Sequence, residues 1–367
     1  MLCEKCAERQ GAGAQFGLVH GEQCFVCKGV MDRTGKMAKL AARMARRFQF
    51  QTFSVGVSLP DGVQEREDEL RSELKLKGSE TIKTQAAKLL AGQISESLAK
   101  RIDRQRPDLT LLVDFGSEGV SVTTRPVFYY GRYTKPAGIS QRRSFCEQCR
   151  GVGCKKCRGT GYERKPSVEE ALRKKLTGFA GSQKMTFTWL GSEDRESRVC
   201  SPGRPFVAEV KSPRKRRLPK RFGVRVRGGI VSVSSGKTLP SKPVRLPPFR
   251  FVTKIRATAA SKVTPEGLSE LKSRFRRAAV RFDRPHSRPA VKMVYRASGK
   301  ASGRSLLIEA ELDGGLPVKR FVSGELVSPS VSEVLKTEVG CRSFDICGVK
   351  EIGRFGFAEV TRVKEKN

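Results

Sequence analysis

The chain has little histidine and no long apolar run. Its 367 residues include only His20 and His286, which argues against a His-centred triad or a catalytic metal site built from several histidines. No apolar run approaches the roughly 18 residues that a membrane-spanning helix needs, and no charged segment followed by an apolar one opens the chain. We therefore expect a cytoplasmic protein, in which disulfide bonds are rare.

A phosphate-binding loop is also missing. The segment VSVSSGKT ends like such a loop, but the motif requires a glycine five residues before Gly236, where the chain has Val231. The sequence therefore predicts no nucleotide cofactor.

Acidic residues are scarce relative to basic ones. The chain has 37 Asp and Glu against 73 Lys and Arg, a net charge of +36. Such an excess favours a polyanionic partner, because each neutralised phosphate releases a condensed counterion. Nucleic acid is therefore the expected partner. Two stretches rich in proline and basic residues, Lys211–Arg221 and Lys242–Arg250, are predicted to be exposed loops that contact it.

Cysteine is plentiful for a chain expected to lack disulfides. Eight of the eleven cysteines form four CxxC pairs, a pattern typical of zinc sites. The pairs are Cys3 with Cys6, Cys24 with Cys27, Cys146 with Cys149, and Cys154 with Cys157. Four thiolates make a closed tetrahedral site, so we expect one or two structural zinc ions, with reduced pairs without metal as the alternative. The other three, Cys200, Cys341 and Cys347, are predicted to be isolated packing residues.

The order of strand and helix signals predicts an α+β fold in three regions. Residues 1–48 form a zinc-binding segment, 49–144 a small α+β module, and 145–367 a larger domain whose start carries the second cysteine group. In the module, apolar residues recur every four positions from Thr81 to Ile102, which indicates an amphipathic helix.

The third region has more strands than helices. Its strands mostly follow one another, which indicates a mixed, largely antiparallel sheet with flanking helices. One helix is expected over SVEEALRKKLTGFAG, where Ser167 and Glu170 have capping-box spacing. Another is expected around TPEGLSELKSRFRRAAVRF.

An acidic turn precedes the first basic loop. In WLGSEDRESR, Gly191 allows a bend after a strand and presents Glu193 and Asp194, with Arg198 close enough to balance one acid. Asp194 is either an exposed acid paired with a neighbouring arginine, which contributes little, or a reactive carboxylate delivered to RNA by the basic residues.

Five motifs in order give the chain a family resemblance. They are the N-terminal CxxC pairs, EREDELRSEL, PVFYYGRYTKP, the CRGxGC group followed by SVEE, and GGLPVKRFVSGELVSPSVSEVL. Together with GSED and GRPFVAEV, they resemble the archaeal and eukaryotic tRNA pseudouridine synthases that carry a THUMP RNA-binding domain, and the chain looks like a divergent archaeal member.

The resemblance implies an isomerase that converts uridine 55, and in some members uridine 54, of the tRNA T-arm. It gives Asp194 the role of nucleophile or base and Lys319 that of its salt-bridge partner. It places Ile346 under the base and Ile255 where the family has a tyrosine that stacks on the base. RNA contacts are expected from Arg198, Arg204, Lys211, Arg214, Lys215, Arg216, Arg217, Lys220, Arg221 and Arg256.

The implied partner is tRNA, with the THUMP-like module at the acceptor end and the basic loops on the T-arm. Reaching a uridine inside folded tRNA requires base flipping. No organic cofactor is needed for a redox-neutral isomerisation, and a monomer is expected.

The chain departs from the family pattern at three positions. Ile255 replaces the tyrosine, Pro317 replaces an aromatic residue, and Ser192 replaces an arginine. Without the phenol, we expect activity at position 55 to survive better than at position 54. The alternative is a catalytically impaired zinc-containing tRNA-binding protein on the same scaffold. A third reading rests on the tandem CxxCxGxG units, which resemble Hsp40-type zinc repeats, but those proteins have four repeats and a His-Pro-Asp signature that this chain lacks.

Overall fold

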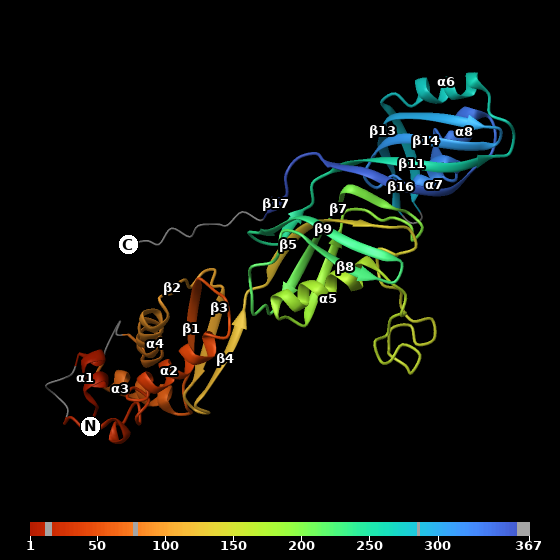
Figure 1. The fold of residues 1–367 in the computed structure, drawn as a ribbon. Coiled ribbons are helices and arrows are strands. Elements are labelled where there is room, and N and C mark those ends of the chain that lie inside the picture. The colour runs from red at the N-terminus through yellow and green to blue at the C-terminus, as the bar shows by residue number, and fades with distance from the viewer. Residues whose placement is uncertain (12–16, 76–79, 285–286, 358–367) are drawn as a thin grey trace. The chain divides into compact units, whose positions relative to one another are not determined.

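The computed structural model describes residues 1–11, 17–75, 80–284 and 287–357 (Figure 1). The chain divides into two compact units. The first comprises Met1–Pro126 together with the short segments Ala180–Gln183 and Lys211–Arg216, and the second contains the remainder. No helix among the described residues has the length and apolar character needed to cross a membrane.

The first unit packs helices on a four-stranded sheet with the order β2-β1-β3-β4. Strand β1 is parallel to β2 and β3, and β4 is antiparallel to β3. Its elements are α1 (Glu4–Gln10), the 3₁₀ helix η1 (Gly21–Gln23), α2 (Thr34–Ala45), β1 (Thr52–Ser58), α3 (Val63–Glu73), α4 (Ile82–Leu98), β2 (Arg101–Ile102), β3 (Leu109–Asp114) and β4 (Gly119–Thr124).

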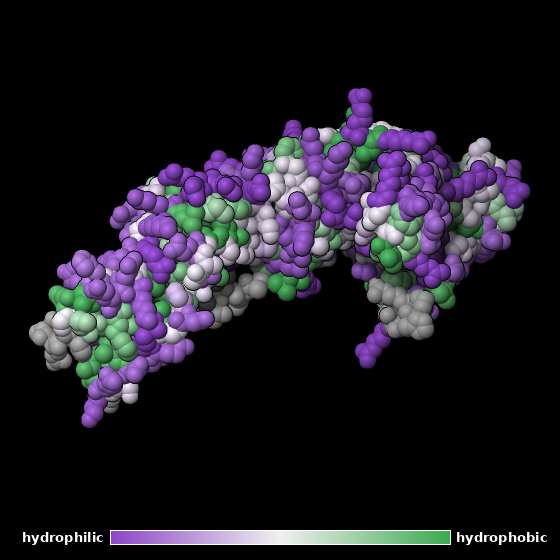
Figure 2. All heavy atoms as spheres, turned by 90° about the horizontal axis from the view of Figure 1, so that it is seen from below, coloured by the Kyte–Doolittle hydropathy of each residue, from purple (hydrophilic) through white to green (hydrophobic). Residues whose placement is uncertain are grey.

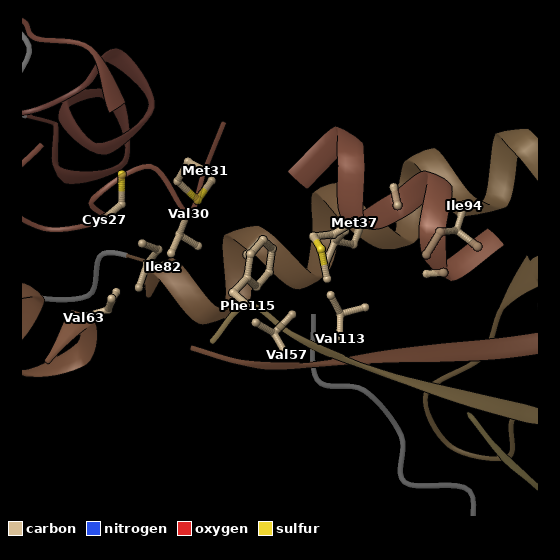
Figure 3. Packing of buried hydrophobic residues seen from close by; sticks show 14 of the residues in the cluster. Cys27, Val30, Met31, Met37, Val57, Val63, Ile82, Ile94, Val113 and Phe115 are labelled. Carbon is tan, nitrogen blue, oxygen red and sulfur yellow. The ribbon is translucent and has the colours of Figure 1, made fainter. Parts of the chain in front are cut away.

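One hydrophobic core runs through this unit from Leu2 to Phe115. Figure 3 shows Met37 and Phe115 meeting Val57 and Val113 between helices and sheet. The buried cysteines of the N-terminal segment belong to the same core. The segment 1–48 and the module that follows it are therefore one packing unit, although the sequence divides them by motif.

The helix expected from Thr81 to Ile102 is shorter than its apolar pattern suggests. Thr81 caps it by accepting a hydrogen bond from the Thr84 amide, and it ends at Leu98 because Ala99 takes a left-handed conformation. Ile102 lies in β2 instead and is 44 % exposed. Its four-residue spacing was therefore misleading, since the chain had already left the helix.

The second unit is built around an eleven-stranded sheet. Its main order is β15-β12-β13-β14-β11-β16-β7-β5-β9-β8, and β6 pairs with β7. The elements are β5 (Val127–Lys135), α5 (Val168–Ala180), β6 (Lys184–Trp189), β7 (Val199–Lys211), β8 (Phe222–Val226), β9 (Gly229–Leu239), β10 (Pro243–Arg245), β11 (Phe249–Ala259), α6 (Pro265–Arg274), β12 (Ala278–Arg284), β13 (Ser287–Ser302), β14 (Ser305–Asp313), α7 (Val318–Ser323), β15 (Val327–Ser328), α8 (Val331–Leu335), β16 (Val339–Glu351) and β17 (Gly356–Phe357). The predicted α+β class, with a mixed and largely antiparallel sheet, is confirmed.

Two differences concern the limits of elements. Val127–Lys135, placed by sequence in the 49–144 module, is strand β5 and pairs with β7 and β9 inside the large sheet. The helix expected around residues 264–282 stops at Arg274, and Ala278–Arg284 pairs with β13 as a strand. The β-branched and aromatic residues Val280 and Phe282 favour the strand, and both are buried.

Alternation along β11 separates two faces of the sheet. Ile255 and Ala257 are buried, while Lys254 and Arg256 are exposed. The short helices α6, α7 and α8 contact strands of this sheet or one another. Figure 2 shows hydrophilic side chains over most of the face in view, as the high content of charged residues requires.

Candidate active site and cysteine clusters

The turn between β6 and β7 brings Asp194 to a lysine that lies 125 residues later in the sequence. The Lys319 ammonium, at the start of α7, lies 2.8 Å from Asp194 Oδ2. Hydrogen bonding to this carboxylate raises the pKa of Lys319. Side-chain exposures of 42 % for Asp194 and 58 % for Lys319 leave the pair open to a ligand. The ion pair that the family resemblance implies is therefore present, and Asp194 does not pair with Arg195 or Arg198.

Glu193 differs completely from its neighbour. Its side chain is fully buried and lies 3.2 Å from the guanidinium of Arg204. The hydroxyl of Tyr133 donates to Glu193 at 2.6 Å and accepts from the Gln141 amide at 2.9 Å. Burial raises the pKa of Glu193, while Arg204 opposes that shift. The contacts of the buried Glu193 thus hold the turn in place, and Asp194 is the acid of this pair that faces solvent.

A second buried group holds the same turn in place. Lys135, at the end of β5, is 2 % exposed. Its ammonium donates to the carbonyls of Asp194 at 3.3 Å, Arg195 at 3.2 Å and Ser197 at a shorter distance. Burial lowers the pKa of Lys135. Sequence reasoning missed this residue, although a lysine at the end of the otherwise buried strand VFYYGRYTK was a signal that the group needs a partner.

The loop after Asp194 is also tied to β16. Asp345 accepts from the Arg198 amide and from the Arg256 guanidinium, each at 3.0 Å. The Ile346 amide donates to the Arg198 carbonyl at 2.8 Å, where β16 and β7 run parallel. Asp345 was not singled out from the sequence. It links the acidic turn to the central strands and so positions the groups around Asp194.

The apolar residues assigned to the base are inside the protein. Ile255 has no exposed surface and lies in register with Phe344 and Ile308 of the adjacent strands. Ile346 is 1 % exposed. Neighbouring strands and the core cover the Ile255 side chain, so in this structure it presents no surface to a base.

We predict that Ile255→Val destabilises the second unit by about 1 kcal/mol, since it removes one buried methylene from a packed core. Denaturant unfolding followed by fluorescence of the single tryptophan, Trp189, measures this effect. Leu307→Ala is the matched control, because Leu307 lies on a neighbouring strand and is 41 % exposed. Equal, negligible effects of both substitutions would contradict the burial of Ile255.

The basic residues expected to contact RNA fall into two groups. Arg204 and Arg216 are already occupied. Arg204 is 3 % exposed and serves the buried Glu193, so the expectation that it contacts RNA is not met. Arg216 pairs with Asp108 at 3.3 Å in the first unit, and burial lowers its pKa. The exposed members are Arg198, Lys211, Arg214, Lys215, Arg217, Lys220, Arg221 and Arg256, of which Arg256 also contacts Asp345.

The first cysteine cluster is buried in the core of the first unit. The sulfur atoms of Cys3, Cys6, Cys24 and Cys27 all lie within 4.8 Å of one another. The guanidinium of Arg9 donates to Cys6 Sγ at 3.5 Å and pairs with the buried Glu67 at 3.0 Å. A buried cation beside four thiolates offsets their excess negative charge, so this donor set fits a tetrahedral metal ion such as zinc.

The second cluster lies in an arm that projects from the second unit without helix or strand (Figure 1). The sulfur atoms of Cys146, Cys149, Cys154 and Cys157 lie within 4.8 Å of one another. The two tandem CxxC pairs therefore form one cluster, and the two N-terminal pairs form the other.

Backbone geometry suits the arm for metal ligation. Burial opposes ionisation of Cys157, but the amides of Cys154 and Gly161 donate to its sulfur at 3.1 and 3.3 Å and lower its pKa to about 6. Gly161 has φ +74°, and a Cβ there would lie 2.3 Å from the Gly151 carbonyl oxygen. Gly153 and Gly161, the last glycines of the two CxGxG repeats, are therefore required by the close approach of the two knuckles.

The remaining cysteines are not isolated, contrary to expectation. Burial raises the pKa of the Cys341 thiol to about 11, while the charge of Lys319 opposes that shift. Strands β7 and β16 pair at Val199 and Ile346, and Cys200 and Cys347 are the next residues along these strands. Burial and a side-chain hydrogen bond with Cys200 raise the pKa of Cys347.

Comparisons with known proteins agree with this architecture. The family described as "Pus10 THUMP domain, archaeal" matches residues 37–114, and "Pus10, C-terminal" matches residues 128–245. The tRNA pseudouridine synthase Pus10 of Cenarchaeum symbiosum is 32% identical over 327 residues, which cover 88% of this chain and 80% of that protein. The protein of the same name from Nitrosopumilus maritimus is 28% identical over 330 residues, covering 90% and 86%.

Among solved structures, the crystal structure of a Cbf5-Nop10-Gar1 complex resembles 60% of this chain and 48% of its own chain, at 8% identity and a TM-score of 0.33. That likeness is too slight to assign residues. The Pus10 relatives, in contrast, match 88% and 90% of this chain. The chain belongs to the Pus10 family of tRNA pseudouridine synthases.

Proposed function

We propose that this protein is a tRNA pseudouridine synthase that isomerises uridine 55 of the T-arm, with Asp194 as the catalytic carboxylate. The observation that carries the proposal is the Asp194–Lys319 ion pair on a turn fixed by buried groups. A carboxylate that is exposed, oriented and backed by a cation is suited to attack a sugar or base that is brought to it.

The reaction needs one bond to break and another to form. The bond between N1 and the ribose C1′ is cleaved, the freed uracil rotates, and C5 bonds to C1′. The C5 proton passes to solvent and N1 takes up a proton, so the step balances. Asp194 acts as nucleophile or base in this sequence. Electrons balance without an oxidant, so no redox cofactor enters. Lys319 orients the carboxylate through the 2.8 Å contact.

The buried isoleucines bear on the choice of uridine. Ile255 and Ile346 are buried on strands β11 and β16, which also carry Arg256 and Asp345. With isoleucine at the family tyrosine position, no phenol is available for stacking or proton transfer. We therefore favour position 55 over position 54. The exposed cations near β7 and β8 bind the tRNA phosphates. The free energy of this binding offsets the few kcal/mol that base flipping costs.

Each cysteine cluster is proposed to hold one zinc ion in a structural role. In both, four thiolates leave no open coordination position for a reacting water. The cytoplasmic location, the monomeric state and the contact of the THUMP domain with the acceptor end stay predictions from the sequence and the resemblance.

Release of tritium from tRNA labelled at uridine C5 tests the proposed reaction, because isomerisation exchanges that hydrogen with solvent. We expect release from an unmodified tRNA transcript without any added cofactor. Tight binding of the transcript with no release at any enzyme concentration would favour the alternative, a tRNA-binding protein that has lost its reaction.

We predict that Lys319→Met slows isomerisation about tenfold while tRNA affinity changes less than twofold, since the lysine orients one carboxylate and contributes little to phosphate binding. Single-turnover tritium release gives the rate, and filter binding gives the affinity. Lys336→Met is the matched control. It lies at the end of α8 in the same unit and should leave both quantities unchanged. An equal loss in the two variants would contradict a specific role for Lys319.

A further inference from the structure

The arm between Arg142 and Lys165 carries more than its cysteines. It contains eight Lys and Arg residues against two Glu, a difference of 8 − 2 = +6. Nearly all of these cations are exposed. The exposed ones are Arg142, Arg150, Lys155, Lys156, Arg158, Arg164 and Lys165. The four cysteines are sufficient to stabilise the arm when they bind a metal ion, so this positive charge is not needed for folding. It indicates an anionic partner.

An aromatic stack lies at the base of the arm. Phe145 and Tyr162 face each other across an antiparallel bridge, with ring centroids 5.2 Å apart and planes 19° from parallel. The Arg143 guanidinium lies 3.7 Å from the Tyr162 ring centroid and is itself held by Glu169 at 3.4 Å. The order Arg143, Tyr162, Phe145 makes a rigid stack whose last ring is open.

Phe145 is the exposed end of this stack. It is 63 % exposed, although it is a large apolar side chain held against a second aromatic ring. Its place is fixed by the backbone, because the Cys146 amide donates to the Gly161 carbonyl at 2.9 Å and the Glu163 amide to the Ser144 carbonyl at 2.9 Å. A fixed, open aromatic ring surrounded by cations is the combination that binds unpaired bases by stacking.

A basic cavity of about 800 Å³ adjoins the stack and reaches the catalytic turn. Tyr162 and Arg143 line one side, and Arg164, Arg195 and Arg227 contribute further cations. Arg195 follows Asp194 directly, and its guanidinium donates to the Gly138 carbonyl at 3.0 Å. The cavity is large enough for a nucleotide, and it is continuous with the turn that presents the candidate catalytic acid.

We propose that this arm is an RNA-docking site, in which the open face of Phe145 stacks on an unpaired base outside the target uridine and the cavity cations bind the neighbouring backbone. The inference rests on the proposed function only in taking tRNA as the substrate. Arg164 and Arg227 make no ion pair with any described residue, so both are available to phosphates. Stacking on Phe145 does not discriminate between bases, since every base has an aromatic face.

Two variants separate stacking from charge. Phe145→Ala should weaken binding of an unmodified tRNA transcript about tenfold at every salt concentration, because stacking depends little on ionic strength. Arg227→Gln should weaken binding mainly at low salt and reduce the slope of log affinity against log salt by about one. Phe145→Trp keeps an aromatic ring at this position and should therefore bind the transcript with the affinity of the wild type. Val152→Ala is the matched control, since Val152 lies in the same arm at 90 % exposure and is not aromatic.

Zinc content must be equal in all variants, so that loss of the arm's fold does not imitate loss of stacking. A Phe145→Ala protein with full zinc and wild-type tRNA affinity would overturn the proposal and leave the arm as a surface for another kind of partner, such as an acidic protein. Failure of the proposed function has a different signature. In that case the wild type binds tRNA without releasing tritium, and the loss of affinity in Phe145→Ala still appears.

Discussion

Asp194→Asn should slow pseudouridine formation by about 10³-fold or more and leave tRNA affinity within about twofold of the wild type. An amide of the same shape can neither attack as a carboxylate nor accept a proton at neutral pH, so the loss falls on the chemical step. Affinity is set largely by phosphate contacts, and the substitution removes one negative charge from the site. Single-turnover tritium release and filter binding measure the two quantities separately.

The turn supplies its own control for this substitution. Glu196 is two residues from Asp194, its side chain is 68 % exposed, and it pairs with Arg195 at 3.7 Å. Glu196→Gln removes the same charge from the same turn and should leave the rate within about twofold. A comparable loss of rate in both variants would mean that the turn acts through its charge, and Asp194 would not be the reacting group.

Cys24→Ser should remove one zinc ion and unfold the first unit at physiological temperature. The four sulfur atoms of this cluster lie in the core of that unit, next to Val26, Val30 and Met31. Structural zinc sites in small domains provide on the order of 10 kcal/mol of folding free energy, as much as a typical domain's whole stability. Without the metal, Arg9 also loses the negative charge of the thiolate cluster that it faces.

The second cluster is the natural comparison for this prediction. Cys149→Ser should likewise remove one zinc ion, but it should leave the calorimetric transition of the first unit unchanged, because the arm belongs to the second unit. Elemental analysis gives the zinc count and scanning calorimetry the transitions. A Cys24→Ser protein that keeps both zinc ions, or that loses one without any shift of the first transition, would contradict a structural metal in the core.

Local sequence patterns predict the parts of this fold that depend on local forces. The cysteine spacing predicts the eight candidate metal ligands, although their grouping into two clusters comes from the structure, and the alternation of apolar residues predicts most strands. The Ser167 hydroxyl accepts from the Glu170 amide at 3.2 Å, as its position before a helix indicates. Helix ends were harder to predict. The apolar spacing continues through Ile102, whereas the left-handed Ala99 and pairing with β1 decide where the helix stops.

The candidate site shows the same division. A strand followed by GSED is sufficient to predict an acidic turn, and the family resemblance supplies Lys319 as its partner. The supports of that turn come from other strands, since Lys135 and Tyr133 lie on β5 and Asp345 on β16. Such contacts join residues 59 to 147 positions apart, and local patterns in one sequence do not identify the two partners. For the same reason Arg204, which looks exposed in a basic segment, proves to be the partner of a buried acid.

Carbodiimide treatment and primer extension on an unmodified tRNA transcript, incubated with wild type and with Asp194→Asn, test directly whether Asp194 isomerises a tRNA uridine. We expect a stop at position 55 with the wild type, no stop at position 54, and neither stop with Asp194→Asn at equal tRNA occupancy. A stop at 55 that persists in Asp194→Asn, or its absence with a wild type that binds the transcript, would contradict the claim that this carboxylate isomerises a tRNA uridine.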